Sequence, residues 1–273
     1  MRSKFPLRKF HIAITNNTKH CYARLMQNVK GDRIQNENSC DAAVILPTYC
    51  EAENIQSLVR TIESLGSDVD ILVIDDSSPD GTAEIVRGLQ KDHQNVQLMI
   101  RPYKDGLGTA ITDGFRFILS KPNPPSYIIT MDADYSHNPL DIPRLLQLAS
   151  EGYDVVIGSR YCRGGKVQGW NLTRLAISSV ANRMTAALIA LPLSDFTSGF
   201  RCYSRKYVET VLPELHSQTY EIQIETLRQA HIHSARVKEI PIIFTNRKRG
   251  KSKLTRNEIV SFLLYILKVT LRK

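Results

Sequence analysis

Short apolar runs alternate with amphipathic segments along the first half of the chain. Five runs have the length and composition of buried strands, at residues 43–46, 71–74, 96–100, 128–131 and 155–157. Between them, apolar residues recur three and four positions apart at 55–62, 85–89 and 145–149, which is the spacing of one helix face. Strands that are apolar throughout and alternate with helices predict an α/β fold, a parallel sheet covered by helices on both faces.

The second half departs from this alternation. A helix is predicted at 173–190, with the polar residues Arg174, Ser178 and Asn182 on one face. A segment around 200–203 precedes a short helix, and the remaining elements are a helix near 221–230, strands at 237–240 and 242–244, and a helix at 257–271. We expect three parts: a basic extension at 1–41, a main domain at 42–254, and an amphipathic C-terminal helix at 255–273 that either faces a membrane or packs in the core.

Charge and composition narrow the choice of partners. A net charge of +9 over 273 residues favours an anionic partner. The basic residues are dispersed and lack interleaved aromatic residues, which argues against a nucleic-acid partner. Five cysteines without a CxxC spacing argue against a disulfide framework or a zinc site and favour the cytoplasm. No stretch approaches the roughly 18 apolar residues of a membrane span, so we expect any membrane contact to be peripheral.

Acidic residues follow two of the predicted strands. Ligands of parallel sheets bind beyond the carboxyl ends of the strands. Asp132 and Asp134 follow the fourth strand two positions apart, so both face one site. Two such carboxylates repel each other unless a cation lies between them, and oxygen ligands suit Mg²⁺ or Mn²⁺. A capping pair in a turn is the alternative explanation of so short a motif, but its position after an apolar strand and before Pro139 and a helix favours the metal site.

Other residues at this edge favour an anionic ligand. Tyr49, after the first strand, has a ring that suits stacking on a base, and Asp76, after the second, suits hydrogen bonding to a base or ribose. The glycine-rich segment 104–108 lets backbone approach a ligand but lacks the Walker pattern. Arg160 follows the fifth strand and, like other arginines, suits bidentate phosphate binding.

Seven motifs occur in one order: LPTYCEAEN at 46–54, DDSSPDGT at 75–82, GLGTA at 106–110, MDADYSHNP at 131–139, GSRY at 158–161, SGFR at 198–201 and RGKSKL at 249–254. Together they resemble the family-two glycosyltransferases of the GT-A fold, most closely the dolichol-phosphate or polyprenyl-phosphate mannosyltransferases. The resemblance covers about residues 42–268. It implies a Rossmann-like, mostly parallel sheet, and it makes 42–254 a catalytic domain.

The resemblance also implies a role for each matching residue. Substrate binding falls to Pro47, Tyr49, Glu51, Ile74, Asp76 and Ala133. Asp132 and Asp134 are implied as metal and donor ligands, together with Ser136. Arg160 and Arg174 are implied as binders of the acceptor phosphate, and Arg247 and Lys253 as clamps on the donor diphosphate. The chain departs from the family at Cys50, where Asn is common, and it lacks the membrane helices of some relatives.

Three functional hypotheses follow. In the first, the protein transfers mannose from GDP-mannose to a polyprenyl phosphate on the cytosolic face of a membrane, with inversion; glucose from UDP-glucose is a close variant. In the second, the acceptor is a hydroxyl of a glycan or protein, and Asp195 acts as base. The Gln-x-x-Arg-Trp signature of processive polysaccharide synthases is not found. The third is a nucleotide-binding regulatory module without catalysis. The oligomeric state is left open.

Overall fold

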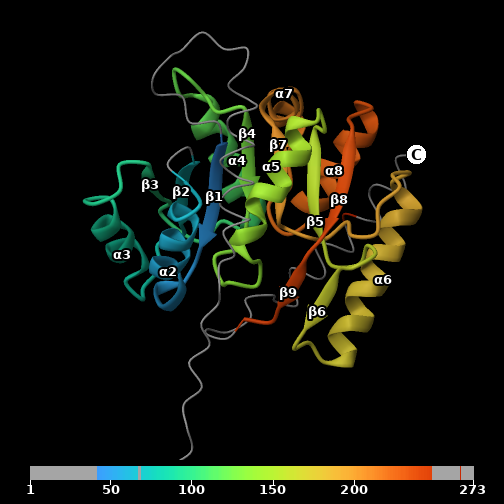
Figure 1. Ribbon diagram of the computed structural model, residues 1–273, viewed down its shortest axis with the longest axis horizontal. Helices are drawn as coiled ribbons and strands as arrows, with labels where there is room; N and C mark the ends of the chain where they lie inside the picture. The colour runs from blue at the N-terminus through green and yellow to red at the C-terminus, as the bar shows by residue number, and fades with distance from the viewer. Residues whose placement is uncertain (1–41, 67–68, 248–264, 266–273) are drawn as a thin grey trace, which may run out of the picture. The chain divides into compact units, whose positions relative to one another are not determined.

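A single mixed sheet forms the centre of the domain in the computed structural model, which describes residues 42–66, 69–247 and 265 (Figure 1). Its strands are β1 (Ala42–Thr48), β2 (Val69–Asp75), β3 (Val96–Ile100), β4 (Tyr127–Thr130), β5 (Val155–Ser159), β7 (Arg201–Ser204) and β8 (Val237–Pro241). Their order is β3-β2-β1-β4-β7-β5-β8. Strands β6 (Lys166–Gln168) and β9 (Ile243–Thr245) pair with each other in a separate parallel ribbon.

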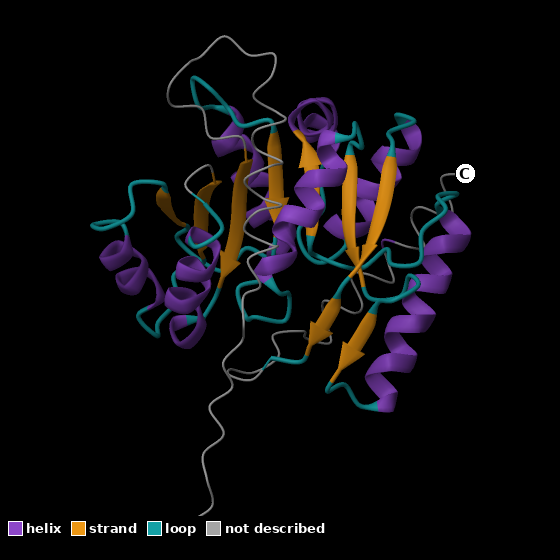
Figure 2. Cartoon of the chain, in the orientation of Figure 1, coloured by secondary structure: helices purple, strands orange, loops and turns teal. Residues whose placement is uncertain are grey.

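Helices cover both faces of the central sheet, as Figure 2 shows. They are α2 (Ala52–Glu63), α3 (Thr82–Leu89), α4 (Leu107–Leu119), α5 (Ile142–Ser150), α6 (Leu172–Leu188), α7 (Arg205–Val211) and α8 (Ile222–Ile232), with 3₁₀ turns at Pro139–Asp141 and Leu212–Glu214. Alternate residues of each strand enter opposite cores. Val44 packs with α2, α3 and α5, whereas Ile45 packs with α4, α7 and α8. This two-sided burial explains why the strands are apolar throughout and confirms the predicted fold class.

The register of the sheet brings the strand ends to one edge. Strand β1 is parallel to both neighbours, with Thr48 opposite Asp75 and Ile45 opposite Thr130. Strand β7 is antiparallel to both β4 and β5, so β5 runs in the same direction as β4. The residues that follow β1, β2, β4 and β5 therefore lie at the same edge.

Three features differ from the sequence-based expectations. The antiparallel β7 interrupts an otherwise parallel sheet, where the sequence indicated only a segment around 200–203. Helix α4 begins at Leu107, within the segment interpreted as a glycine-rich loop. Strand β6 was not predicted. The extension 1–41 and the helix 255–273, apart from Tyr265, lie outside the described residues.

Candidate active site

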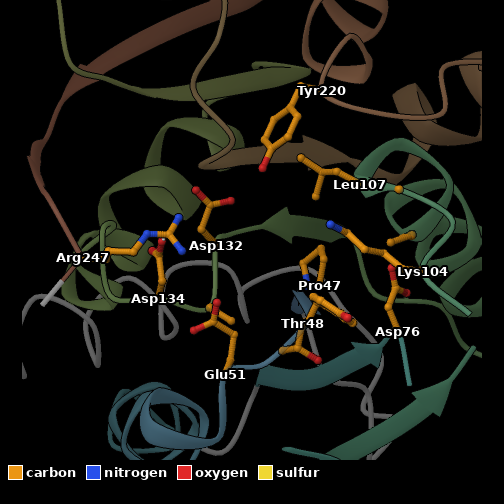
Figure 3. A pocket seen from close by; sticks show the side chains of 14 residues that line it. Pro47, Thr48, Glu51, Asp76, Lys104, Leu107, Asp132, Asp134, Tyr220 and Arg247 are labelled. Carbon is orange, nitrogen blue, oxygen red and sulfur yellow. The ribbon is translucent and has the colours of Figure 1, made fainter. Parts of the chain in front are cut away.

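A cleft opens at the edge where β1, β2 and β4 end (Figure 3). It is lined by Pro47, Thr48, Tyr49, Glu51, Asp76, Lys104, Gly106, Leu107, Ala110, Asp132, Ala133, Asp134, Tyr220 and Arg247. Eight of these residues were predicted as site residues from the sequence. The non-glycine residues Cys50, Ser77 and Tyr135 follow the same three strands with φ of 56°, 52° and 60°. Left-handed backbone of this kind is uncommon and clusters at functional sites.

The acidic pair lies at the end of β4. Asp134 is buried, its Oδ1 accepts a hydrogen bond from the Ser136 N–H at 2.9 Å, and its Oδ2 lies 2.8 Å from Arg247 Nη2. The Asp132 side chain is 41% exposed, and Oδ2 lies 3.7 Å from Nδ1 of the buried His137. Burial within the cleft and, to a smaller extent, the charge of Asp134 raise the pKa of Asp132. Burial lowers the pKa of His137, so its imidazole is neutral near pH 7.

This donor set fits a divalent cation that is shared with a ligand. Two carboxylates whose charges oppose each other's ionisation are stabilised by a cation between them. In the described part of the chain, no group of three or more His, Cys, Asp or Glu side chains is arranged to hold a metal. A cation on Asp132 and Asp134 therefore takes its other ligands from water or from phosphate oxygens, as Mg²⁺ commonly does. The Ser136 carbonyl is engaged by the Thr245 N–H at 3.0 Å, and a ligand role for Ser136 remains a prediction.

The side of the cleft that Asp76 lines contains a buried ion pair that the sequence did not predict. Arg101 Nε and Nη2 donate to the two carboxylate oxygens of Asp76 at 2.6 and 2.8 Å. Burial raises the pKa of Asp76 even though Arg101 opposes the shift. Arg101 follows β3 as Asp76 follows β2, and these two strands are neighbours in the sheet. The position of both residues directly after neighbouring strands is the feature of the sequence that could have predicted the pair. The Ile74 side chain is fully buried in the core, and Ile74 is not among the residues that line the cleft; a substrate-binding role for Ile74 remains a prediction.

Lys104 and Tyr220 complete the cleft from two other loops. The Lys104 Nζ lies 5.0 Å from the centre of the Tyr49 ring, a cation–π distance. The loop before Tyr220 packs tightly on the start of α4, where the Gly108 N–H donates to the Gln218 carbonyl at 2.9 Å. A Cβ at Gly108 would lie 2.3 Å from the Ser217 carbonyl oxygen, so only glycine fits there. The glycine at position 108 thus serves close packing, and approach of the backbone to a ligand remains a prediction.

Arg160 is held by Asp195 beyond the end of β5. Its Nε and Nη2 donate to Asp195 Oδ2 and Oδ1, each at 2.7 Å, and the Asp195 carboxylate is fully buried. The carboxylate also accepts the backbone N–H groups of Arg160, Thr197 and Ser198. Burial opposes the ionisation of Asp195, but Arg160 and these hydrogen bonds outweigh it and lower its pKa. A buried, fully engaged carboxylate with a lowered pKa is unsuited to be a base, so that alternative role for Asp195 is not supported.

Arg174 lies in the first turn of α6, which Asn171 caps by accepting the Arg174 N–H. Burial and then the charges of the nearby Arg247 and Arg160 lower the pKa of Arg174. The predicted polar face of α6 is confirmed. Tyr161 donates to Ser178 Oγ, and Asn182 Oδ1 accepts the Phe196 N–H. Lys253, the other predicted clamp, lies outside the described residues.

The family and the relatives of the chain identify it as a glycosyltransferase. The chain belongs to glycosyl transferase family 2, whose family pattern matches residues 43–212. It is 39% identical over 218 residues to the polyprenol monophosphomannose synthase of Mycolicibacterium smegmatis, covering 79% of this chain and 82% of that protein. It is 36% identical over 213 residues to the undecaprenyl-phosphate mannosyltransferase of Micrococcus luteus, covering 77% of this chain and 86% of that protein.

Solved structures agree on the fold. The glucosyl-3-phosphoglycerate synthase of Mycobacterium tuberculosis, solved with Mn²⁺, UDP and its product, superimposes with a TM-score of 0.63. The match covers 92% of this chain and 83% of that one at 17% identity. A likeness at this identity supports the GT-A fold and leaves the substrates to be argued from the site.

Proposed function

We propose that this glycosyltransferase transfers mannose from GDP-mannose to a polyprenyl phosphate, with inversion at the anomeric carbon. The names of the two bacterial relatives support both the mannosyl group and the polyprenyl-phosphate acceptor. The donor's nucleotide would occupy the cleft between Tyr49, Asp76 and Lys104, and its diphosphate would lie near Asp134 and Arg247.

One observation carries the proposal: three guanidinium groups gather beside the acidic pair, and the buried carboxylate among them is already engaged. Arg247 Nη2 lies 2.8 Å from Asp134 Oδ2, Arg160 and Arg174 both lie over the ring of Trp170, and Asp195 is committed to Arg160. With a divalent cation on Asp132 and Asp134, and with Asp195 committed to Arg160, this side of the cleft would carry a surplus of positive charge, which favours an anionic acceptor. A phosphate acceptor carries its own negatively charged oxygen near neutral pH, so its attack on the anomeric carbon requires no general base.

The acidic pair and Arg247 would act on the leaving group. When bound by Asp132 and Asp134, Mg²⁺ or Mn²⁺ supplies positive charge that stabilises the departing diphosphate. The Mn²⁺ and UDP in the mycobacterial synthase support such a pairing of metal and nucleotide. Arg247 contacts Asp134 and would donate to diphosphate oxygens bound beside it (Figure 3). The N–H of Ser136 orients Asp134 for this purpose.

Helix α6 supplies a surface for peripheral contact with the membrane that holds the acceptor. Its outward face carries Leu172, Ile177, Val180 and Met184, which are between 40% and 83% exposed. The opposite face of the same helix begins with Arg174. No described helix is both long and apolar enough to cross a bilayer. An apolar helix face next to a phosphate-binding arginine suits a protein that lies on the cytosolic membrane surface.

The decisive experiment is product analysis. Purified protein is incubated with GDP-mannose or UDP-glucose, a short polyprenyl phosphate, and Mn²⁺ or Mg²⁺, and the lipid is identified by mass. We expect a lipid heavier by one hexose with GDP-mannose, and NMR of the product to report the inverted anomeric configuration. A lipid adduct that forms only with UDP-glucose would show that the donor is UDP-glucose instead of GDP-mannose. Transfer only to a hydroxyl of a glycan or protein would contradict the proposal that the acceptor is a polyprenyl phosphate.

Flotation with liposomes tests the membrane surface. Placing Asp at Ile177 and Val180 should reduce the fraction of protein that floats, because charge on the apolar face opposes insertion. Ile232→Asp on α8 is the matched control, since Ile232 is 50% exposed and lies on another helix. Equal flotation of the α6 variant and the control would exclude α6 as the membrane contact.

A further inference from the structure

The single tryptophan of the chain, Trp170, lies between two arginines of the cationic cluster. The guanidinium carbon of Arg174 lies 4.1 Å from the centre of the indole ring, and that of Arg160 lies 5.6 Å from it. Both distances are within the cation–π range, and Trp is the aromatic residue that binds cations best. The indole therefore connects the segment after β5 with the first turn of α6.

The surroundings of Trp170 give its ring no other polar anchor. Its Nε1 is buried and has no hydrogen-bond partner within the described part of the chain. A buried N–H without a partner is unfavourable, and Trp rings in cores usually satisfy it. Phe244 of β9 meets the indole edge-on, with centroids 5.3 Å apart and planes at 70°. The ring is thus fixed by an aromatic contact and two cations rather than by a hydrogen bond.

The backbone around Trp170 is tied to β9. Gly169, with φ of 80°, turns the chain after β6, and its carbonyl accepts a hydrogen bond from Asn246 Nδ2 at 3.2 Å. The Asn246 N–H donates to the Gln168 carbonyl at 2.8 Å. These contacts hold the indole beneath Arg174, whose own hydrogen bond to Asn246 Oδ1 is long, at 3.4 Å. Because that hydrogen bond is long whereas 4.1 Å is well within the cation–π range, stacking on Trp170 is the main restraint on the Arg174 guanidinium.

Both arginines keep donors for a ligand. Arg160 uses Nε and Nη2 for Asp195 and Thr197, and its Nη1 makes no hydrogen bond to the described residues. The Nε and Nη2 of Arg174 likewise make none to the described residues. A guanidinium binds phosphate through a planar fork, so its orientation decides whether two N–H groups reach the oxygens. Arg160 is already fixed by Asp195 and lies 5.3 and 5.5 Å from the ring centres of Tyr161 and Phe244, whereas the stacking of Arg174 is on Trp170.

We propose that Trp170 is a positioning residue that preorganises Arg174, beside Arg160, for the acceptor phosphate. The inference rests on the proposed function, which assigns these arginines to the acceptor. Trp170 is absent from the residues that line the donor cleft. Its removal should therefore weaken the acceptor's binding and leave the donor's binding intact. Preorganisation acts by reducing the ordering that a ligand must impose, so it changes affinity without a new contact.

The kinetic test compares Trp170→Leu and Trp170→Phe with the unchanged chain. KM for a short polyprenyl phosphate is measured at saturating GDP-mannose, and Kd for GDP-mannose is measured separately. We expect the Leu variant to raise the acceptor KM about tenfold, the scale of one desolvated cation–π contact. The Phe variant retains a ring and should recover most of this loss. Tyr153→Leu is the matched control, because it removes a cation–π contact with Arg236 at 4.7 Å that is remote from the cleft.

An unchanged acceptor KM in a folded Trp170→Leu variant would overturn the inference. So would equal losses in donor and acceptor binding, since these indicate a general structural role. If the protein without substitutions forms no lipid product, the proposed function is refuted and, with it, the inference.

Fluorescence keeps the inference testable even if the Leu variant does not fold. Because the chain has one tryptophan, its emission reports on Trp170 alone. Titration with the short polyprenyl phosphate should change the emission with a midpoint near the acceptor KM, and Arg174→Met should abolish the change. GDP should produce no comparable effect. Turnover of the lipid without any change in emission would overturn the inference.

Discussion

The buried ion pair between Arg160 and Asp195 allows a sharp test of how the site is built. Asp195→Asn keeps the shape of the side chain but removes the charge that compensates Arg160. The pair has two contacts of 2.7 Å and side-chain exposures of 7% and 0%. Removing one partner of such a pair costs about 3–5 kcal/mol, because the other charge stays buried and uncompensated. The amide of Asn still accepts hydrogen bonds, so we expect a loss of about 3 kcal/mol.

Thermal unfolding measures this loss. At roughly 2–4 °C per kcal/mol for a domain of this size, Tm should fall by about 6–12 °C at pH 7. Glu84→Gln is the matched control, because its pair with Arg87 is a surface pair on α3 with exposures of 67% and 55%. Such pairs contribute about 0.2–1 kcal/mol at most. Combining Asp195→Asn with Arg160→Met removes both charges and should recover part of the lost stability.

The difference between the unchanged chain and Asp195→Asn should also depend on pH. The pKa of Asp195 is lowered in the folded chain, so its charge stabilises the fold fully above its unfolded value of about 3.9. This stability is lost as pH falls through the lower, folded pKa. The difference in Tm should therefore be constant from pH 8 to about 5 and shrink below about 4. If Asp195→Asn lowered kcat but left Tm unchanged, the ion pair with Arg160 would not stabilise the fold, and Asp195 would again be a candidate for the general base.

Three further substitutions test other parts of the site. Asp134→Ala should abolish sugar transfer, measured as lipid product, because it removes a metal ligand; full activity would refute the metal role. Gly108→Ala should lower the free energy of unfolding in urea by at least about 1 kcal/mol, since the alanine Cβ would lie 2.3 Å from the Ser217 carbonyl oxygen. Gly88→Ala on α3 is the control and should stabilise by up to about 1 kcal/mol, because nothing lies within 4 Å of its Cβ. Cys50→Asn should raise Tm slightly, since Asn tolerates the φ of 56° better than Cys.

The strands that form the cleft could be predicted from the sequence because their physics is local. Runs such as 71–74 are apolar throughout, which both covered faces of the sheet require. Once a parallel sheet is inferred, the strand ends must share an edge, and this placed Asp76, Asp132 and Asp134 together. Each has side-chain atoms lining the observed cleft.

The features that the sequence did not predict depend on contacts between residues far apart in the chain. Strand β7 has four residues and exists because it pairs with both β4 and β5, which no local pattern reveals. Helix α4 begins among glycines that have low helix propensity, and the packing on Ser217 outweighs that preference. Asp76 and Arg101 are 25 residues apart, and Arg160 and Asp195 are 35 apart. The sequence indicated the charges, whereas only the fold assigns their partners.

The contact between Arg247 and Asp134 implies a competition that can be measured. Arg247 Nη2 lies 2.8 Å from Asp134 Oδ2, so its charge occupies the place where a divalent cation would neutralise the carboxylate. A cation bound to Asp134 would release Arg247 toward the diphosphate of the donor. The same arginine should therefore oppose metal binding before the donor arrives and favour donor binding afterwards.

Arg247→Met tests this exchange by moving two affinities in opposite directions. Without nucleotide, Mn²⁺ should bind up to about tenfold more tightly, because a competing charge worth about 1.4 kcal/mol is gone. With Mn²⁺ present, GDP-mannose should bind more weakly, because the diphosphate loses a charged donor. The signal of free Mn²⁺ in electron paramagnetic resonance measures the first affinity, and calorimetry measures the second. A variant that weakens both would show that Arg247 supports the acidic pair instead of competing for it.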